Sequence, residues 1–147
     1  MLTVKTALRA KGVGATALTT KLGGQHIYQS DQEIDIAALI TGGAAAVVIF
    51  TCVTDAPDVE TGYVAQVYQF DVFAQTADLA DEVAELLTDT YAWRHGVASG
   101  TLTGLVGRRL AEPVTATVGP RDMPREPLPA PLHRRSRSFK VATYPAC

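Results

Sequence analysis

The stretch GYVAQVYQFDVFAQTADLADEVAELL, Gly62–Leu87, changes its hydrophobic period partway along. Up to about Ala74 the residues alternate as in a strand with two mixed faces, and from Thr76 the apolar residues recur at helical spacing. Thr76 is a favourable N-cap residue for that helix, and Asp78 lies in its first turn. The stretch therefore predicts a strand followed directly by an amphipathic helix, and it contains no His, Cys or Lys.

The composition is typical of a globular protein. The 147 residues are 47% hydrophobic and 19% charged, so we predict a single domain, residues 1–147, with a core that needs no disulfide or metal. No apolar run approaches the roughly 20 residues of a membrane span, and the N-terminus lacks a secretory signal pattern, so we expect cytoplasmic synthesis. Cys52 lies in an apolar run and is expected to be a buried small hydrophobe, with a bridge to Cys147 disfavoured.

The first half of the chain predicts helices around a buried strand. Two short helical segments lead to Gly23–Gly24, where glycine tolerates a left-handed helix cap. Ser30–Glu33 has the S-x-x-E form of a capping box before about two more helical turns. Ala44–Val53 is apolar on both faces, which is typical of a central strand.

The second half predicts strands and an extended loop. Leu102–Val118 indicates one or two strands, in which Pro113 favours an edge or a bulge. A proline-rich loop is expected at about residues 119–132, and the last strand is expected to carry Arg135 and Phe139 on one side. The order α-α-β-β-α-β-β predicts an α+β domain with a mostly antiparallel four-stranded sheet and helices packed on one face.

Charge is unevenly distributed along the chain. Residues 1–100 hold 12 acids and 5 bases, whereas residues 101–147 hold 3 acids and 8 bases. Either the two halves neutralise each other in the fold, or an acidic face and a basic face favour contact between copies or with a charged partner. The second interpretation makes eight residues candidates for an interface: Asp81, Glu82, Glu85, Arg121, Arg125, Arg134, Arg135 and Arg137.

The motifs that could form a nucleotide-binding or metal-binding site are better explained by structural roles. GVGATA, Gly12–Ala17, spells G-x-G-x-x-A, but a dinucleotide site needs a strand before the motif and a long helix after it. A helical segment precedes it here, so it predicts a helix break. His26, His95 and His133 lack the spacing of a metal site, and no cofactor is indicated.

The segment YAWRHG, Tyr91–Gly96, is expected to end the helix of the opening stretch. Arg94 and His95 would then lie near the negative end of the helix dipole, with Gly96 as the stop. An active site there would need a further nucleophile or acid that the sequence does not place nearby. We therefore predict that the chain is not an enzyme.

Three segments together carry a resemblance to a known family. LRAKGVGATALTTKLGGQHIY, VYQFDVFAQTADLADEVAELL and RSRSFKVATYP resemble, in this order, the opening helices, the central strand and helix, and the last strand of the tail-completion proteins, or tail terminators, of long-tailed phages. The resemblance implies a structural virion protein that assembles as a hexameric ring and caps the tail tube. Its implied partners are copies of itself, the major tail tube protein and a head-closure protein, with DNA passing through the lumen without specific binding.

Several hypotheses follow from this resemblance. An edge strand or the Pro120–Pro131 arm would lie on the neighbouring copy, and the acidic helix Asp78–Asp89 would face the lumen or a ring interface. A head-closure or neck protein of the same virion is an alternative role. An alternative from another class is a small dimeric ligand-binding domain, which predicts a deep pocket near Trp93–His95.

Overall fold

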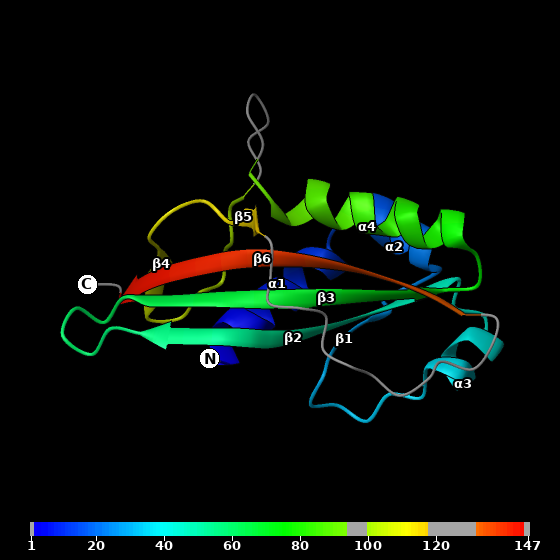
Figure 1. Ribbon diagram of the computed structural model, residues 1–147, viewed down its shortest axis with the longest axis horizontal. Coiled ribbons are helices and arrows are strands. Elements are labelled where there is room, and N and C mark those ends of the chain that lie inside the picture. The colour runs from blue at the N-terminus through cyan, green and yellow to red at the C-terminus, as the bar shows by residue number, and fades with distance from the viewer. Residues whose placement is uncertain (1, 94–99, 118–131, 146–147) are drawn as a thin grey trace.

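The structure is a computed structural model and describes residues 2–93, 100–117 and 132–145. In the described residues the helices are α1 (Leu2–Val13), α2 (Thr16–Leu22), α3 (Ile36–Thr41) and α4 (Ala77–Tyr91). The strands are β1 (Ile27–Gln29), β2 (Ala46–Pro57), β3 (Val64–Ala74), β4 (Arg108–Leu110), β5 (Thr115–Thr117) and β6 (His133–Pro145). Figure 1 shows these elements as helices beside one long, twisted sheet. The predicted α+β class is confirmed.

The sheet has six strands in the described residues, not the four that the sequence predicts. Its order is β1-β2-β3-β6-β4, and β5 also pairs with β6. All neighbours are antiparallel except β1 and β2, which run parallel. Parallel neighbours need a crossover connection, and α3 lies within it. The predicted segment Leu102–Val118 contains two strands, β4 and β5, which agrees with the expectation of one or two strands there, and β1 is the strand that the predicted order lacks. Each of these three strands has only three residues, too few for a hydrophobic period to reveal its bounds.

The long strands β2 and β3 form a hairpin that is buried at one end and exposed at the other. They pair from Ala46–Ala74 to Pro57–Val64, with an irregularity between Cys52 and Thr54. From Tyr68 to Ala74 both faces of β3 are buried, although polar residues occur on this half of the strand, as the mixed faces predicted from the sequence require. The polar side chains there are enclosed by the protein itself.

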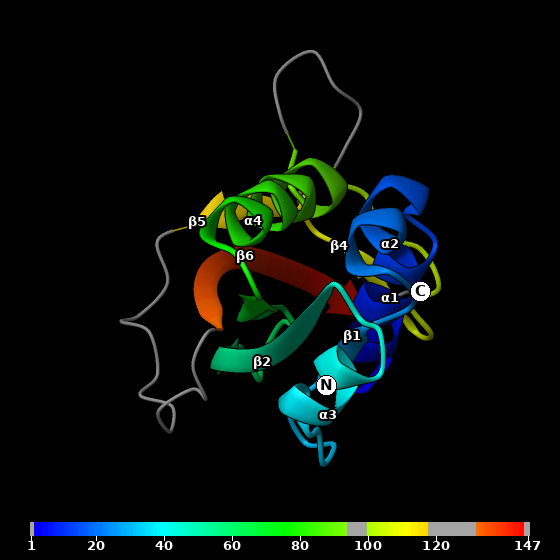
Figure 2. The ribbon, with the colours of Figure 1, turned by 90° about the vertical axis from the view of Figure 1, so that its right-hand side faces the viewer.

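Helices cover both faces of the sheet. The larger core joins α1, α2 and α4 to one face through residues such as Phe50, Phe70 and Phe139. The smaller core joins α3 to the opposite face through Val47 and Phe73. Figure 2 shows α3 apart from the other three helices. The predicted single helical face thus describes three of the four helices.

Local capping agrees with the sequence in two places and differs in a third. The Thr76 hydroxyl accepts a hydrogen bond from the Leu79 N–H at 3.2 Å, and Gly23 caps α2 in the left-handed region, as predicted. The capping box at Ser30–Glu33 is wrong, because α3 begins later and the Asp35 carboxylate accepts from the Ala38 N–H. Asp is as favourable an N-cap residue as Ser, so residue type alone does not decide whether this helix starts after Ser30 or after Asp35.

Helix α4 ends earlier than expected. Its last residue is Tyr91, and Ala92 is already extended, with φ −88° and ψ 142°. The Trp93 N–H donates to the Val114 carbonyl at 2.7 Å, which joins the chain to the segment before β5. The predicted stop at Gly96 is therefore wrong. Arg94, His95 and Gly96 themselves lie outside the described residues.

The predicted helix break at Gly12–Ala17 is confirmed, and it serves packing. A Cβ on Gly12 would lie 2.4 Å from the Tyr91 hydroxyl and 2.6 Å from Cδ1 of Ile27. The Tyr91 hydroxyl donates to the Leu8 carbonyl at 2.6 Å, and burial raises the pKa of Tyr91 well above its ordinary value. Glycine therefore lets α1 lie directly against α4 and β1.

Candidate functional site

The acidic side of α4 faces two arginines of β6, Arg135 and Arg137. Nε of Arg135 lies 2.7 Å from Oδ1 of Asp81, and Nη2 of Arg137 lies 3.5 Å from Oε1 of Glu85. Side chains alternate along β6, so these two arginines lie on the same side of the strand as Phe139, as predicted. Phe139 belongs to the core beneath α4, which is why the arginines reach the acids of that helix. The side chains in these pairs are partly exposed, so each pair contributes about 1 kcal/mol at most.

The third acid predicted for an interface is also paired within the chain. Nζ of Lys21, on α2, lies 2.9 Å from Oε2 of Glu82. The three acids of α4 proposed from the sequence thus bind cations from α2 and β6. These contacts support the interpretation in which the acidic and basic halves of the sequence neutralise each other in the fold.

Arg134 lies on the opposite face of the sheet from Arg135 and Arg137. Its Nη2 is 2.9 Å from Oδ1 of Asp71, whose side chain is only 1% exposed. The Ser136 hydroxyl and the Gln69 amide also donate to Asp71, at 2.6 and 3.1 Å. This buried network joins β3 to β6. The other two candidates, Arg121 and Arg125, lie outside the described residues, as does nearly all of the proline-rich loop.

A group of acids without an ion pair in the described residues lies on the β2–β3 hairpin. Residues 54–61 are all exposed and include Asp55, Asp58 and Glu60 but no Lys or Arg. Val59, at the tip, is 94% exposed. Within the described part of the chain none of these acids forms an ion pair.

Hydrogen bonds connect the residues of the hairpin tip to one another and to Arg108. The Asp58 carboxylate accepts from the Glu60 N–H at 3.0 Å, and the Gly62 N–H donates to the Asp58 carbonyl at 2.8 Å. Nη2 of Arg108 donates to the Gly62 carbonyl at 2.6 Å. These bonds fix the backbone of the turn that carries Val59 and its acidic neighbours.

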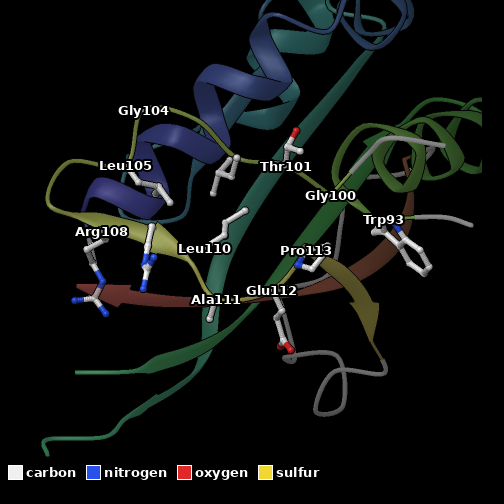
Figure 3. A pocket seen from close by; sticks show the side chains of 12 residues that line it. Trp93, Gly100, Thr101, Gly104, Leu105, Arg108, Leu110, Ala111, Glu112 and Pro113 are labelled. Atoms are coloured by element: carbon white, nitrogen blue, oxygen red, sulfur yellow. The ribbon is translucent and has the colours of Figure 1, made fainter. Parts of the chain in front are cut away.

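An open pocket of about 770 Å³ lies between the end of α4 and β4 (Figure 3). Its lining is mostly apolar, with Leu105, Leu110 and Pro113, and it includes Trp93, which is 47% exposed. The other lining residues are Gly100, Thr101, Leu102, Gly104, Arg108, Arg109, Ala111 and Glu112.

The charged residues of this pocket differ in what they bind. Arg108 donates to Thr143 and Gly62, and Oε1 of Glu112 lies 3.1 Å from Nζ of Lys140. Arg109 is exposed, and its guanidinium has no hydrogen-bond or ion-pair partner within the described residues. The pocket therefore offers one guanidinium to an incoming group.

Other reactive side chains have structural roles. Nδ1 of His26 lies 3.1 Å from the Tyr28 hydroxyl, and the described residues contain no group of His, Cys, Asp or Glu that could hold a metal ion. Cys52 is half-buried, not fully buried as expected, and is a free thiol. Burial, and then the nearby Asp55 carboxylate, raise its pKa, which disfavours the nucleophilic thiolate. No helix in the described ranges is long and apolar enough to cross a membrane.

Sequence reasoning missed the hairpin tip and Arg109 as features of interest. The segment APDVETG, Ala56–Gly62, indicates a turn, and its single Val gives no signal by itself, because isolated apolar residues are common on protein surfaces. Arg109 carries no signal either, because its neighbour Arg108 has the same residue type and yet donates hydrogen bonds to Thr143 and Gly62.

The fold is similar to that of a solved virion chain. A chain in the structure described as "Virion of native gene transfer agent (GTA) particle" matches 97% of this chain and 95% of its own length, with a TM-score of 0.66 and 17% identity. At this identity the match shows a shared fold. No protein-family model and no curated protein sequence matches the chain.

Proposed function

We propose that this chain is a structural protein of a phage-like virion. The observation that carries the proposal is the fold shared, over nearly the whole of both chains, with a chain of the gene transfer agent virion. The proposed role is non-enzymatic, and the protein acts through the shape of its surface.

Within that virion, the proposed role is tail terminator. The chain would cap the tail tube as a hexameric ring, end tube polymerisation and form the tail side of the head–tail junction. Support comes from the sequence resemblance of three segments, which form α1 to β1, β3 with α4, and β6 in the structure. The proposed partners are copies of the chain, the tube protein and a head-closure protein.

The charge arrangement supports passage of DNA without specific binding. A DNA-binding surface needs several Lys or Arg side chains available to phosphates. Here Arg134, Arg135 and Arg137 of β6 are ion-paired to carboxylates within the chain. Pairing lowers the attraction that this basic cluster exerts on a phosphate backbone.

Polymerisation of purified tube protein tests the role. Adding this chain to growing tubes is expected to arrest growth and leave it bound at tube ends, as seen by negative-stain electron microscopy. Binding to the head-side connector but not to tubes would instead assign the chain to the head-closure position. Normal tube growth with no end binding would contradict the terminator role.

The pocket beside Trp93 favours a second candidate function, a small ligand-binding domain. Its volume of about 770 Å³ is within the range of small-molecule sites. Trp93 is the single tryptophan of the chain, so its fluorescence reports directly on the pocket. A saturable change in emission with a metabolite library, matched by calorimetry, would favour this function. No change is expected if the chain is a virion component.

A further inference from the structure

The hairpin tip and the pocket beside Trp93 are complementary surfaces on the same chain. The tip presents Val59 between the carboxylates of Asp58 and Glu60. The pocket presents apolar walls and the guanidinium of Arg109, which has no partner in the described residues. We propose that the hairpin tip of one copy inserts into the Trp93 pocket of the next copy, with Val59 against the apolar wall and Glu60 beside Arg109.

The tip lies beside the pocket of its own chain without entering it, because Arg108, which lines the pocket, is bound to the base of the tip. Arg108 binds the Gly62 carbonyl, and the rings of Tyr63 and Tyr144 pack with centroids 5.2 Å apart. Gly62 lies so close to Pro145 that a Cβ there would be 2.6 Å from the proline ring. No residue of the exposed tip lines the pocket. Insertion of a hairpin tip into this pocket therefore requires the tip of a second copy.

The surroundings of the tip favour this side-chain contact over strand pairing. β1 covers the outer side of β2 only at Val48–Phe50, so the rest of that edge has no strand partner in the described residues. An irregularity at Cys52/Thr54 and Pro57 interrupt this edge, and both features disfavour the addition of a strand. The contact available to the tip is therefore the insertion of side chains.

The proposed contact is heterologous, because each copy gives its tip to one neighbour and its pocket to the other. Such a contact extends from copy to copy and closes into a ring when the rotation allows it, whereas a contact between identical patches stops at a dimer. The inference thus deepens the proposed function and rests on it, because it identifies the surfaces that would join neighbours in the ring. The acids of α4 are paired within the chain, so the proposal places the contact between copies at the hairpin instead of at these acids.

Disulfide crosslinking tests the contact. In a Cys52→Ser, Cys147→Ser background, Val59→Cys combined with Thr101→Cys places one thiol on the tip and one at the pocket, since Thr101 lines it. Mild oxidation of the concentrated protein is expected to give a ladder of covalent oligomers that needs both cysteines. The matched control is Val59→Cys with Ala37→Cys, an exposed position on α3. Dimers from Val59→Cys alone, or equal yields from test and control, would overturn the proposal.

A charge exchange tests the role of Glu60 and Arg109 in the same assay. Glu60 is chosen because Oδ1 of Asp58 holds the turn, and its loss would disturb the tip itself. Glu60→Arg or Arg109→Glu alone is expected to abolish the ladder, and both changes in one chain are expected to restore it. Circular dichroism checks that each variant is folded. Failure of the double variant to recover would count against the pairing.

The tube-growth assay separates this inference from the proposed function. If the ladder is absent but the unmodified chain still arrests tube growth, the contact is wrong and the terminator role stands. If the ladder forms but tubes grow normally, the copies join as proposed and the terminator role is wrong.

Discussion

Arg135 of β6 and Asp81 of α4 lie 54 residues apart in sequence and 2.7 Å apart in the fold. Both are partly exposed, so the pair contributes about 1 kcal/mol or less to the free energy of unfolding. Asp81→Arg and Arg135→Asp are each expected to lower that free energy by about this amount, because each creates a like-charge contact. The double exchange is expected to recover most of the loss, as measured by urea denaturation. Strict additivity of the two losses would contradict a direct pair.

The buried pair between Asp71 and Arg134 is expected to matter more. Asp71→Asn removes the charge that the guanidinium faces at 2.9 Å, and breaking a buried pair costs roughly 3–5 kcal/mol. We expect about 3 kcal/mol, at the low end, because the Arg134 side chain keeps 21% of its surface exposed and can be partly hydrated. Asp81→Asn is the matched control at an exposed pair, with a loss of about 1 kcal/mol or less. Equal losses for the two variants would show that burial has no effect.

Gly12 tests the packing of α1 against α4. Gly12→Ala introduces a Cβ that meets the Tyr91 hydroxyl and Ile27, and overpacking of this kind typically costs about 1–3 kcal/mol. Gly14→Ala is the control, because its Cβ would lie 3.3 Å from its nearest neighbour, the Ala10 carbonyl. Thermal unfolding is expected to rank Gly12→Ala as clearly less stable. Adding Tyr91→Phe to Gly12→Ala is expected to cost less than the sum of the single changes, since one clash disappears.

Cys52 is expected to alkylate slowly. Burial and Asp55 raise its thiol pKa, so at any pH below that pKa the thiolate fraction is smaller than for a free thiol. In Cys147→Ser protein, the iodoacetamide rate is expected to rise with pH over a range above that of glutathione. Asp55→Asn removes one cause of the raised pKa and is expected to speed the reaction at fixed pH. A rate profile that coincides with glutathione would contradict the raised pKa.

The sequence predicts elements whose period is carried by many residues. The switch from alternation to helical spacing at Ala74–Thr76 appears in the structure as β3 followed by α4, and the Thr76 cap is where the residue type predicts it. Features that depend on a few residues or on distant partners were not predictable in this way. The parallel pairing of Ile27–Gln29 with Val48–Phe50 joins only three residues and is decided by tertiary packing.

The interface candidates show the same limit. The sequence identifies Asp81, Glu85, Arg135 and Arg137 as charged surface residues but not as partners of one another, because the contact requires α4 to lie across β6. Likewise Arg108 and Arg109 are equivalent in sequence, and only the structure separates the engaged guanidinium from the available one. Sequence patterns predict which residues are charged and exposed, and the fold determines which charges remain for a partner.

Electron cryomicroscopy of intact particles from the producing cell tests the central claim most directly. The account predicts that this chain fits density forming a single ring at the head-proximal end of the tail, continuous with the tube and enclosing a central hole. Density for the chain along the whole tube or within the capsid shell, or its absence from purified particles that carry complete tails, would contradict the account.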